Sequence, residues 1–271
     1  MVQYLRTSEV AAAVGVHPNT VRLYEAWGFL PPVPRSPSGY RLFTESHLDQ
    51  MRLARKALQG PYPGGKQVVL DLVYRAASGD LGGALEQAYI YLAQVRAERA
   101  RAEAAAELLE RWAQGAAADA TAQLLYIGEA AQLLGVTRDM LRNWERNGLI
   151  KVPRDARNGY RLYGAAEIGR LRVIRTLRRA GYSMMAILRM LRHLDQGWEG
   201  DLRRVLDTPR PDEDACVATD RWLTTLAELE GRAMDVIAQL EVMVRKRQEE
   251  ALEGLECHGP YQTLHLPTNV A

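Results

Sequence analysis

The chain is poor in cysteine and phenylalanine, with two residues of each among 271. Two cysteines without a secretory signal do not indicate a disulfide framework. No apolar run approaches the roughly 18 residues that cross a bilayer, so a transmembrane helix is not expected. The segment from Met1 to Arg6 also lacks the apolar stretch of a signal peptide. We therefore expect a cytoplasmic protein.

Motifs of catalysis are missing as well. The sequence contains no glycine-rich phosphate loop, no cluster of metal ligands and no nucleophile motif at useful spacing. Neither an enzyme nor a bound cofactor is therefore expected. The chain, with 271 residues of which 47% are hydrophobic, is long enough for two or more domains with ordinary cores.

Positive charge is concentrated in two stretches of the chain. The net charge is +3 over residues 1–60 and +8 over 121–196, whereas 61–120 and 197–271 carry −2 and −7. Basic segments separated by acidic ones are expected where the basic segments bind a polyanion. The alternative is that an arginine-rich run such as 170–179 is only a solvated helix face.

One segment occurs twice, at a constant offset of 120 positions. The stretch from Glu9 to Phe43 aligns with that from Glu129 to Tyr163 without a gap, and the tetrapeptide Gly-Tyr-Arg-Leu at 39–42 recurs at 159–162. The shared residues are turn glycines, arginines and aromatics. This duplication indicates a repeated binding unit.

Each copy begins with two short helices joined by a glycine turn. Thr7 or Ser8 is expected to cap a helix that Gly15 ends, and Thr137 is the expected cap of the second helix in the other copy. This arrangement is a helix-turn-helix, whose second helix enters the DNA major groove.

The outer face of each second helix is expected to contact DNA. It carries a triplet at three-residue steps, which is Asn19, Arg22 and Glu25 in the first copy and Asp139, Arg142 and Glu145 in the second. The arginines are expected to contact a guanine edge or a phosphate, or else to pair with the acidic residue three positions away. Tyr24 and Trp144 either pack beneath the helix or reach the DNA backbone.

A basic hairpin is expected after each second helix. Ser38-Gly39 and Asn158-Gly159 are turn signals between short runs. The flanking arginines are Arg35 and Arg41 in the first copy and Arg154, Arg157 and Arg161 in the second. Such a hairpin is typical of a wing that meets the DNA backbone or minor groove. The alternative is a solvated hairpin that only covers the core.

In combination, these motifs resemble the DNA-binding domain of the MerR family of bacterial transcription regulators. The resemblance rests on Arg-x-Tyr/Trp-Glu, then Gly-Leu/Phe-Ile/Leu, then Gly-Tyr-Arg-Leu-Tyr/Phe, and covers most of the first 58 residues and nearly all of 126–196. It implies two further helices after the wing, the second opening with Gly-Phe/Tyr-Ser, whose backbone N–H groups hold a DNA phosphate. The segment Gly181 to Ser183 fits, whereas the first copy has Pro61 to Gly65 at that place.

The residues and the resemblance together predict one set of DNA-contacting positions. The set is Asn19, Arg22, Tyr24, Arg35, Tyr40, Arg41, Arg138, Arg142, Trp144, Arg154, Arg157, Tyr160, Arg161, Tyr182 and Ser183.

Each unit is followed by an apolar seam at alternating three- and four-residue steps. The seams run from Leu85 to Leu109 and from Leu226 to Met243, and such spacing makes a coiled-coil face. Each helix could instead pack on its own domain. The resemblance implies an antiparallel pair, formed either within one chain as a mimic of a MerR dimer or in a homodimer with four DNA-binding units.

We therefore expect a mainly α fold with two winged helix-turn-helix domains, each with a small β-hairpin wing and each followed by a long coiled-coil-type helix. The expected boundaries are 1–79 for the first winged domain, 80–114 for its long helix, 115–123 for a linker, 124–197 for the second winged domain, 198–250 for an acidic connector and the second long helix, and 251–271 for a tail.

The resemblance implies a regulator that binds double-stranded DNA, distorts a promoter and has RNA polymerase as a partner. Because the copies differ, a site with unequal halves is expected. Three alternatives are an architectural or recombination-associated DNA-binding protein, a protein-interaction module and a metal-responsive regulator. Cys216, Cys257 and His258 resemble the layout of the family's metal sensors, but they are fewer than the usual ligand set, so no metal is expected.

Overall fold

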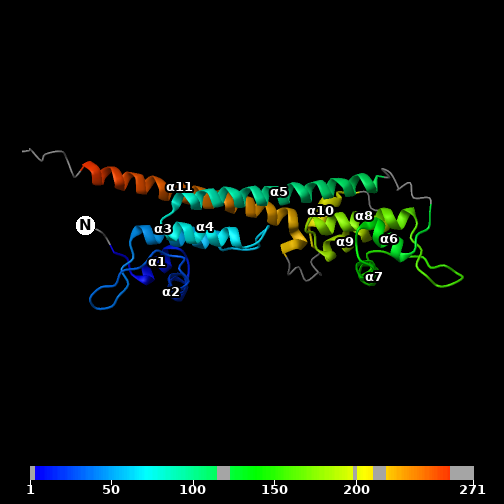
Figure 1. Cartoon of the computed structure of the whole chain (residues 1–271), viewed down its shortest axis with the longest axis horizontal. Coiled ribbons are helices and arrows are strands. Elements are labelled where there is room, and N and C mark those ends of the chain that lie inside the picture. The colour runs from blue at the N-terminus through cyan, green and yellow to red at the C-terminus, as the bar shows by residue number, and fades with distance from the viewer. Residues whose placement is uncertain (1–3, 115–122, 198–199, 210–217, 257–271) are drawn as a thin grey trace, which may run out of the picture. The chain divides into compact units, whose positions relative to one another are not determined.

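The computed structural model describes residues 4–114, 123–197, 200–209 and 218–256 (Figure 1). This part of the chain is mainly helical, as expected, and contains isolated β-bridges but no named strand. None of its helices is long and apolar enough to cross a membrane. Its contacts divide the chain into two units, one of Met1–Leu92 with Arg232–Ala271 and one of Ala93–Gly231.

Each unit combines a set of short helices with parts of the two long ones. The first contains α1 (Thr7–Ala13), α2 (Pro18–Ala26), α3 (Glu45–Ala57) and α4 (Gln67–Ala77), with the start of α5 (Leu81–Ala113) and the later part of α11 (Trp222–Glu256). The second contains α6 (Ile127–Leu134), α7 (Arg138–Arg146), α8 (Ala165–Arg179), α9 (Met184–Asp195), α10 (Leu202–Asp207) and the short η1 (Ala218–Arg221), with the later part of α5 and the start of α11.

The repeat extends to the hydrophobic core. In the first unit the core cluster consists of Val10, Ala11, Val21, Leu30, Phe43, Leu48 and Met51. The residues 120 positions later, Ala130, Ala131, Leu141, Ile150, Tyr163, Ile168 and Leu171, are buried as well. Burial of such side chains stabilises the fold by about 1.5–3 kcal/mol each. Each copy therefore has its own core, built from residues at equivalent positions.

The helix starts agree with the sequence in one copy and differ in the other. Thr137 caps α7, because its Oγ1 accepts the backbone N–H of Met140 at 3.1 Å. In contrast, α1 begins at Thr7, so this residue lies inside the helix rather than capping it. The carboxylate of Glu9 instead accepts the backbone N–H of Arg6 at 2.6 Å, which satisfies a donor that a helix start leaves unpaired.

The arginine-rich run 170–179 does more than form a solvated face. Arg170 donates through Nε to the carbonyl of Leu149 at 2.8 Å, and Arg175 donates to the carbonyl of Leu134, the last residue of α6. Carbonyls at the end of a helix have no partner within it. These arginines therefore hold neighbouring segments onto α8.

The apolar seams of the long helices are buried. In α11 every expected member is buried, namely Leu226, Leu229, Ala233, Val236, Leu240 and Met243. In α5 the buried members are Ala88, Leu92, Val95, Ala102, Ala106 and Leu109. Helix α11 continues to Glu256, into the stretch expected to be a tail. Most of the expected linker, the tail beyond Glu256, and Cys216, Cys257 and His258 lie outside the described residues.

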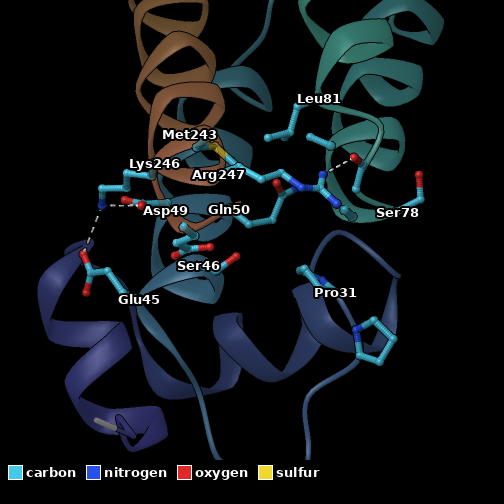
Figure 2. A pocket seen from close by; sticks show the side chains of 15 residues that line it. Pro31, Glu45, Ser46, Asp49, Gln50, Ser78, Leu81, Met243, Lys246 and Arg247 are labelled. Carbon is cyan, nitrogen blue, oxygen red and sulfur yellow. Dashed lines mark hydrogen bonds and ion pairs between the residues drawn. The ribbon is translucent and has the colours of Figure 1, made fainter. Parts of the chain in front are cut away.

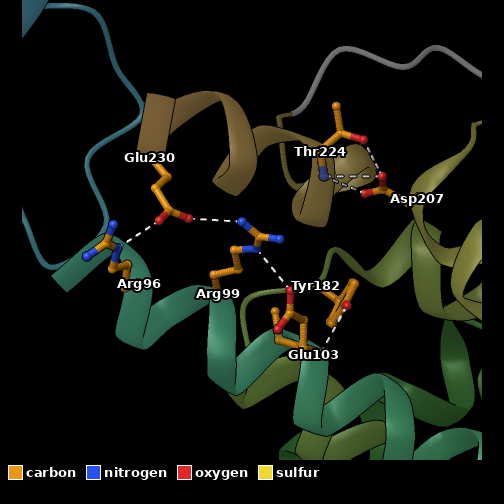
Figure 3. Close-up of polar contacts among 8 residues, drawn as sticks. Arg96, Arg99, Glu103, Tyr182, Asp207, Thr224 and Glu230 are labelled. Carbon is orange, nitrogen blue, oxygen red and sulfur yellow. Dashed lines mark hydrogen bonds and ion pairs between the residues drawn. The ribbon is translucent and has the colours of Figure 1, made fainter. Parts of the chain in front are cut away.

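Glu230 of α11 lies between two arginines of α5 in the second unit (Figure 3). Arg96 Nε donates to its carboxylate at 2.7 Å, and Arg99 Nη1 donates to the other oxygen at 2.9 Å. The bond from Arg96, and after it the bond from Arg99, lower the pKa of Glu230 below its ordinary value of 4.5. The bond to Glu230, and after it a bond to Glu103, raise the pKa of Arg99.

The start of α9 is anchored to both long helices. The phenol of Tyr182 is fully buried and donates to the carbonyl of Ala102 at 3.1 Å, and burial raises its pKa. The indole of Trp222 donates to the carbonyl of Ala180 at 2.8 Å. Between these contacts lies Gly181, with a φ of +94°, where an added Cβ would meet Trp222 Nε1 at 2.5 Å.

We expect Gly181→Ala to destabilise the second unit more than Gly197→Ala does. Both glycines have positive φ, but an added Cβ at Gly197 meets nothing within 4 Å. Backbone strain alone should cost Gly197→Ala about 1 kcal/mol, and the collision with Trp222 should cost Gly181→Ala a further ~1–3 kcal/mol. Urea unfolding of the two variants measures the difference in free energy of unfolding. Equal losses in both variants would show that the contact with Trp222 does not exclude a side chain at position 181.

Glu230→Gln should make unfolding less dependent on acid pH. Because the folded pKa of Glu230 is lowered, its stabilisation is complete above 4.5 and is lost as pH falls through the folded pKa. The difference in free energy of unfolding between wild type and Glu230→Gln should therefore shrink below about pH 4. Glu228→Gln, an exposed change on the same helix, is the control. A constant difference at every pH would contradict the ion pairs.

Candidate nucleic-acid interface

A groove borders the second helix of the helix-turn-helix in each unit. The first has a volume of about 660 Å³ and is lined by residues that include Pro18, Arg22, Tyr40 and Arg41. The second has a volume of about 600 Å³ and is lined by residues that include Arg142, Arg154, Tyr160 and Arg161. Each groove therefore places an arginine of the helix beside the loop that follows it.

Each of these loops closes on itself through one antiparallel bridge. The bridges join Arg35 to Arg41 and Arg154 to Arg161. Because Arg35 would align with position 155 at the constant offset, the structural match to Arg154 shows that the loops differ by one residue within their length. The turn spans 36–40 in the first copy and 155–160 in the second. The ungapped alignment is therefore wrong over 31–40, where the second copy has one residue fewer before the bridge and one more in the turn. The offset of 120 applies again from Arg41.

One carboxylate ties each loop to its helix. Glu25 of α2 binds Arg35 at 3.1 Å and also Arg41, and Glu145 of α7 binds Arg161 at 2.6 Å. The side chains of Glu25 and Glu145 are 16% and 19% exposed, so the ion pairs are partly shielded from water. The Glu-to-Arg spacing of 16 residues is the same in both copies, a signal that the sequence contained.

The arginines of the second helices each pair with the side chain three positions earlier. Arg22 donates to Asn19 Oδ1 at 3.1 Å, and Arg142 donates to Asp139 Oδ1 at 2.9 Å. Arg142 thus has an acidic partner three positions away, as the sequence allowed. Arg22 pairs with an amide instead, because Glu25 is occupied by the loop. Arg142 is half exposed, with 50% of its side chain open to solvent.

Two aromatic members of the expected set are corrected. Trp144 is 3% exposed and Tyr182 is fully buried, so packing leaves their side chains no surface for DNA. Tyr24 is half-buried and meets the ring of Phe29 edge-on at 5.5 Å. For Tyr24 and Trp144, packing beneath the helix is the observed alternative.

The remaining members lie at the surface or at helix starts. Tyr40 and Tyr160 are 74% and 64% exposed. The side chains of Arg138 and Arg157 are exposed. Ser183 caps α9, since its Oγ accepts the backbone N–H of Ala186 at 2.9 Å, and its hydroxyl donates to Asp220.

The start of α4 in the first unit is built differently from that of α9. Lys66 precedes α4 and makes no side-chain cap, and its ammonium lies 5.8 Å from the centre of the Tyr62 ring. The segment from Pro61 to Gly65 therefore leads into a helix without the serine cap that α9 has.

A polar cavity of about 360 Å³ lies in the first unit between α3, α4, α5 and α11 (Figure 2). Lys246 of α11 binds the buried carboxylate of Asp49 at 2.6 Å, which raises the pKa of Lys246. The neighbouring Gln50 is 1% exposed and donates to two carbonyls, while its Oε1 has no partner.

The matching positions in the second unit are Gly169 and Arg170. An added Cβ at Gly169 would lie 3.2 Å from Trp112 Nε1, so the tryptophan takes the space of a side chain there. Arg170 binds Asp195 at 2.5 Å. The polar pair that lines the cavity is therefore a feature of the first copy.

Comparison with protein families found one model that matches both copies. The model describes the MerR HTH family regulatory protein, and it matches residues 5–62 and 125–194. A relative from Haemophilus influenzae, named as a probable heavy metal-dependent transcriptional regulator, is 32% identical over 123 residues, which is 45% of this chain and 81% of that protein. The chain belongs to the MerR family.

Other MerR-family relatives match over shorter stretches. The mercuric resistance operon regulatory protein of Bacillus cereus is 34% identical over 70 residues, 26% of this chain and 53% of that protein. The HTH-type transcriptional regulator CueR of Escherichia coli is 38% identical over 55 residues, 20% of this chain and 41% of that protein. The chain thus spans about half or less of these two relatives. No solved structure matched it significantly.

Names of some MerR relatives refer to metals, which raises the question of metal ligands here. Within the described ranges, no group of three or more His, Cys, Asp or Glu side chains is placed to hold a metal ion. The candidates from the sequence, Cys216, Cys257 and His258, are not among the described residues.

Glu25→Gln and Glu145→Gln should each loosen one loop and leave the other unchanged. A neutral amide keeps the shape but loses the charge-assisted bonds, which are worth ~1 kcal/mol at this exposure. Amide hydrogen exchange should then rise about fivefold in 34–42 for the first variant and in 153–162 for the second. If either variant loosened both loops, or neither, the carboxylates would not be what ties the loops down.

Proposed function

We propose that this chain is a sequence-specific DNA-binding transcription regulator that uses two winged helix-turn-helix units on one site. The observation that carries the proposal is the duplicated groove, where Arg22 or Arg142 lies beside an exposed tyrosine and the bridged loop. Guanidinium groups beside a helix that fits the major groove suit contacts to base edges and phosphates.

The bridged loops are proposed to act as wings. Their carboxylate ties place Arg41 and Arg161 against the helix, and Tyr40 and Tyr160 extend into solvent beside it. A wing held in this way meets the DNA backbone without first having to be ordered, so less conformational entropy is lost on binding. Arg35, Arg154 and Arg157 add charge along the same edge.

The two long helices are proposed to pair within one chain and so to replace a MerR dimer. In the first unit Leu85 of α5 and Val244 of α11 line one groove, and in the second unit Arg96 and Arg99 of α5 bind Glu230. Residues with higher numbers in α5 thus lie beside residues with lower numbers in α11, as in an antiparallel pair of helices. Burial of both seams supports the same arrangement.

By resemblance to the family, the proposed mechanism is distortion of a promoter so that RNA polymerase can engage it. Two units held by one scaffold can oppose the stiffness of DNA with many backbone contacts. Net charges of +3 and +8, with the serine cap found only at α9, indicate that the second unit is the stronger binder. An architectural DNA-binding protein would use the same contacts, and occupancy away from promoters would favour it.

The proposal predicts one chain per DNA site and unequal contributions from the two helices. Native mass spectrometry of a complex with a selected duplex should show a single 30.3 kDa chain bound. Arg142→Ala should weaken binding by about tenfold to a hundredfold, and Arg22→Ala by less. Arg101→Ala, which removes an exposed arginine of α5 that pairs with Glu98, is the charge-matched control.

Two chains on one duplex would contradict the intramolecular pair while leaving DNA binding intact. Equal affinity of wild type, Arg22→Ala and Arg142→Ala would instead contradict the interface itself. A footprint between promoter elements would separate promoter distortion from architectural binding.

A further inference from the structure

The helices α2 and α7 share their arginine but differ in the exposed side chains that follow it. In α2 these are Leu23 and Ala26, with Trp27 just after the helix, and in α7 they are Asn143 and Arg146, with Asn147 just after it. The opposite sides carry Val21 and Leu141, which are buried in the two cores. The exposed side chains that follow the arginine are therefore apolar in α2 and polar in α7.

The first position after the arginine is placed to meet bases. Leu23 follows Arg22, which lines the groove, and 47% of its surface is exposed without a polar group to hydrate. Leu23 lies two residues, or about 200° around the helix, from the buried Val21, so it faces away from the core. Trp27 lies beyond the end of α2 and packs against Phe29 at 5.8 Å, so it is held away from that part of the helix.

The side chains at this position suit different base edges. A leucine has no polar atoms, and the apolar feature of the major groove is the methyl group of thymine. An asparagine amide matches adenine, donating to N7 and accepting from N6. In α7 the Oδ1 of Asn143 accepts a bond from Asn147 Nδ2 at 2.9 Å. This bond orients the Nδ2 group of Asn143 as a donor and leaves its oxygen a second lone pair for adenine N6.

We propose that Leu23 and Asn143 determine the sequence difference between the two half-sites. Leu23 reads the methyl group of a thymine in the half-site bound by the first unit. Asn143 reads an adenine in the other, donating to N7 and accepting from the N6 amino group, which guanine lacks. This inference rests on the proposed function, because it requires both helices to enter major grooves. It explains the inequality of the half-sites by one pair of equivalent residues rather than by charge alone.

The test removes single atoms from the DNA rather than whole bases. In a duplex selected from a random pool, each thymine is replaced in turn by deoxyuridine and each adenine by 7-deazaadenine, and binding of the full chain is measured by fluorescence anisotropy. Loss of one thymine methyl should weaken wild type about fourfold, the factor that burial of one methyl group contributes. Loss of one adenine N7 in the other half-site should weaken it about fivefold.

The variants exchange the two residues. Leu23→Asn should abolish the methyl effect and keep the N7 effect, and Asn143→Leu should do the reverse. Trp27→Asn is the matched control, since it replaces an exposed apolar residue of the first unit by its counterpart in the second and should change neither effect. Met140, which is 41% exposed in α7, could also meet a methyl group, but such an effect would survive Leu23→Asn.

The outcomes separate this inference from the proposed function. If wild type binds a specific sequence but the methyl and N7 effects persist in Leu23→Asn and Asn143→Leu, the assignment of the two residues is overturned while DNA recognition stands. If no duplex is preferred over random DNA, the proposed function itself fails. Thermal unfolding of each variant shows whether a loss of binding reflects a loss of fold.

Discussion

The short helices of both copies depend on the burial of a single apolar face. A helix of nine residues is marginal in water by itself, and α2 and α7 are both of this length. Val21 and Leu141 fix them to two cores that are built from residues at equivalent positions. Because that contact sets how each helix is rotated, it decides which side chains remain outside, Arg22 and Leu23 in one unit and Arg142 and Asn143 in the other.

Arginine serves two purposes in this molecule, and burial of the partner group distinguishes them. Arg170 donates to the carbonyl of Leu149 in the loop after α7, and Arg175 donates to that of Leu134 at the end of α6, so their charge is used in holding the fold. Arg22 and Arg142 make only a short-range pair on an open surface. A count of positive charge along the sequence adds the two kinds together, and the +8 of the second copy therefore overstates the charge available to DNA.

Much of the fold was predictable from the sequence, because helical periodicity and turn glycines are local signals. The two long helices and the Thr137 cap follow from such patterns, as does the repeat itself. The choice between a buried and an exposed aromatic was not predictable, since Trp144 and Tyr24 occupy equivalent positions and differ in how much of the ring the core covers. The partner of Arg142 followed from local spacing, since Asp139 lies three residues away on the same helix. The partner of Arg22 did not, because Glu25 binds a loop that the fold brings to it.

The one-residue difference between the two bridged loops has a consequence for how the copies can diverge. The extra residue lies in the turn between the two bridged arginines, which are Arg35 and Arg41 in one copy and Arg154 and Arg161 in the other. The second arginine of each pair also binds the carboxylate of the helix. Length can therefore change at the tip while the base keeps its register. The tip of such a loop can vary in sequence and length without changing the rest of the domain, because the bridge and the ion pair that hold the loop lie at its ends.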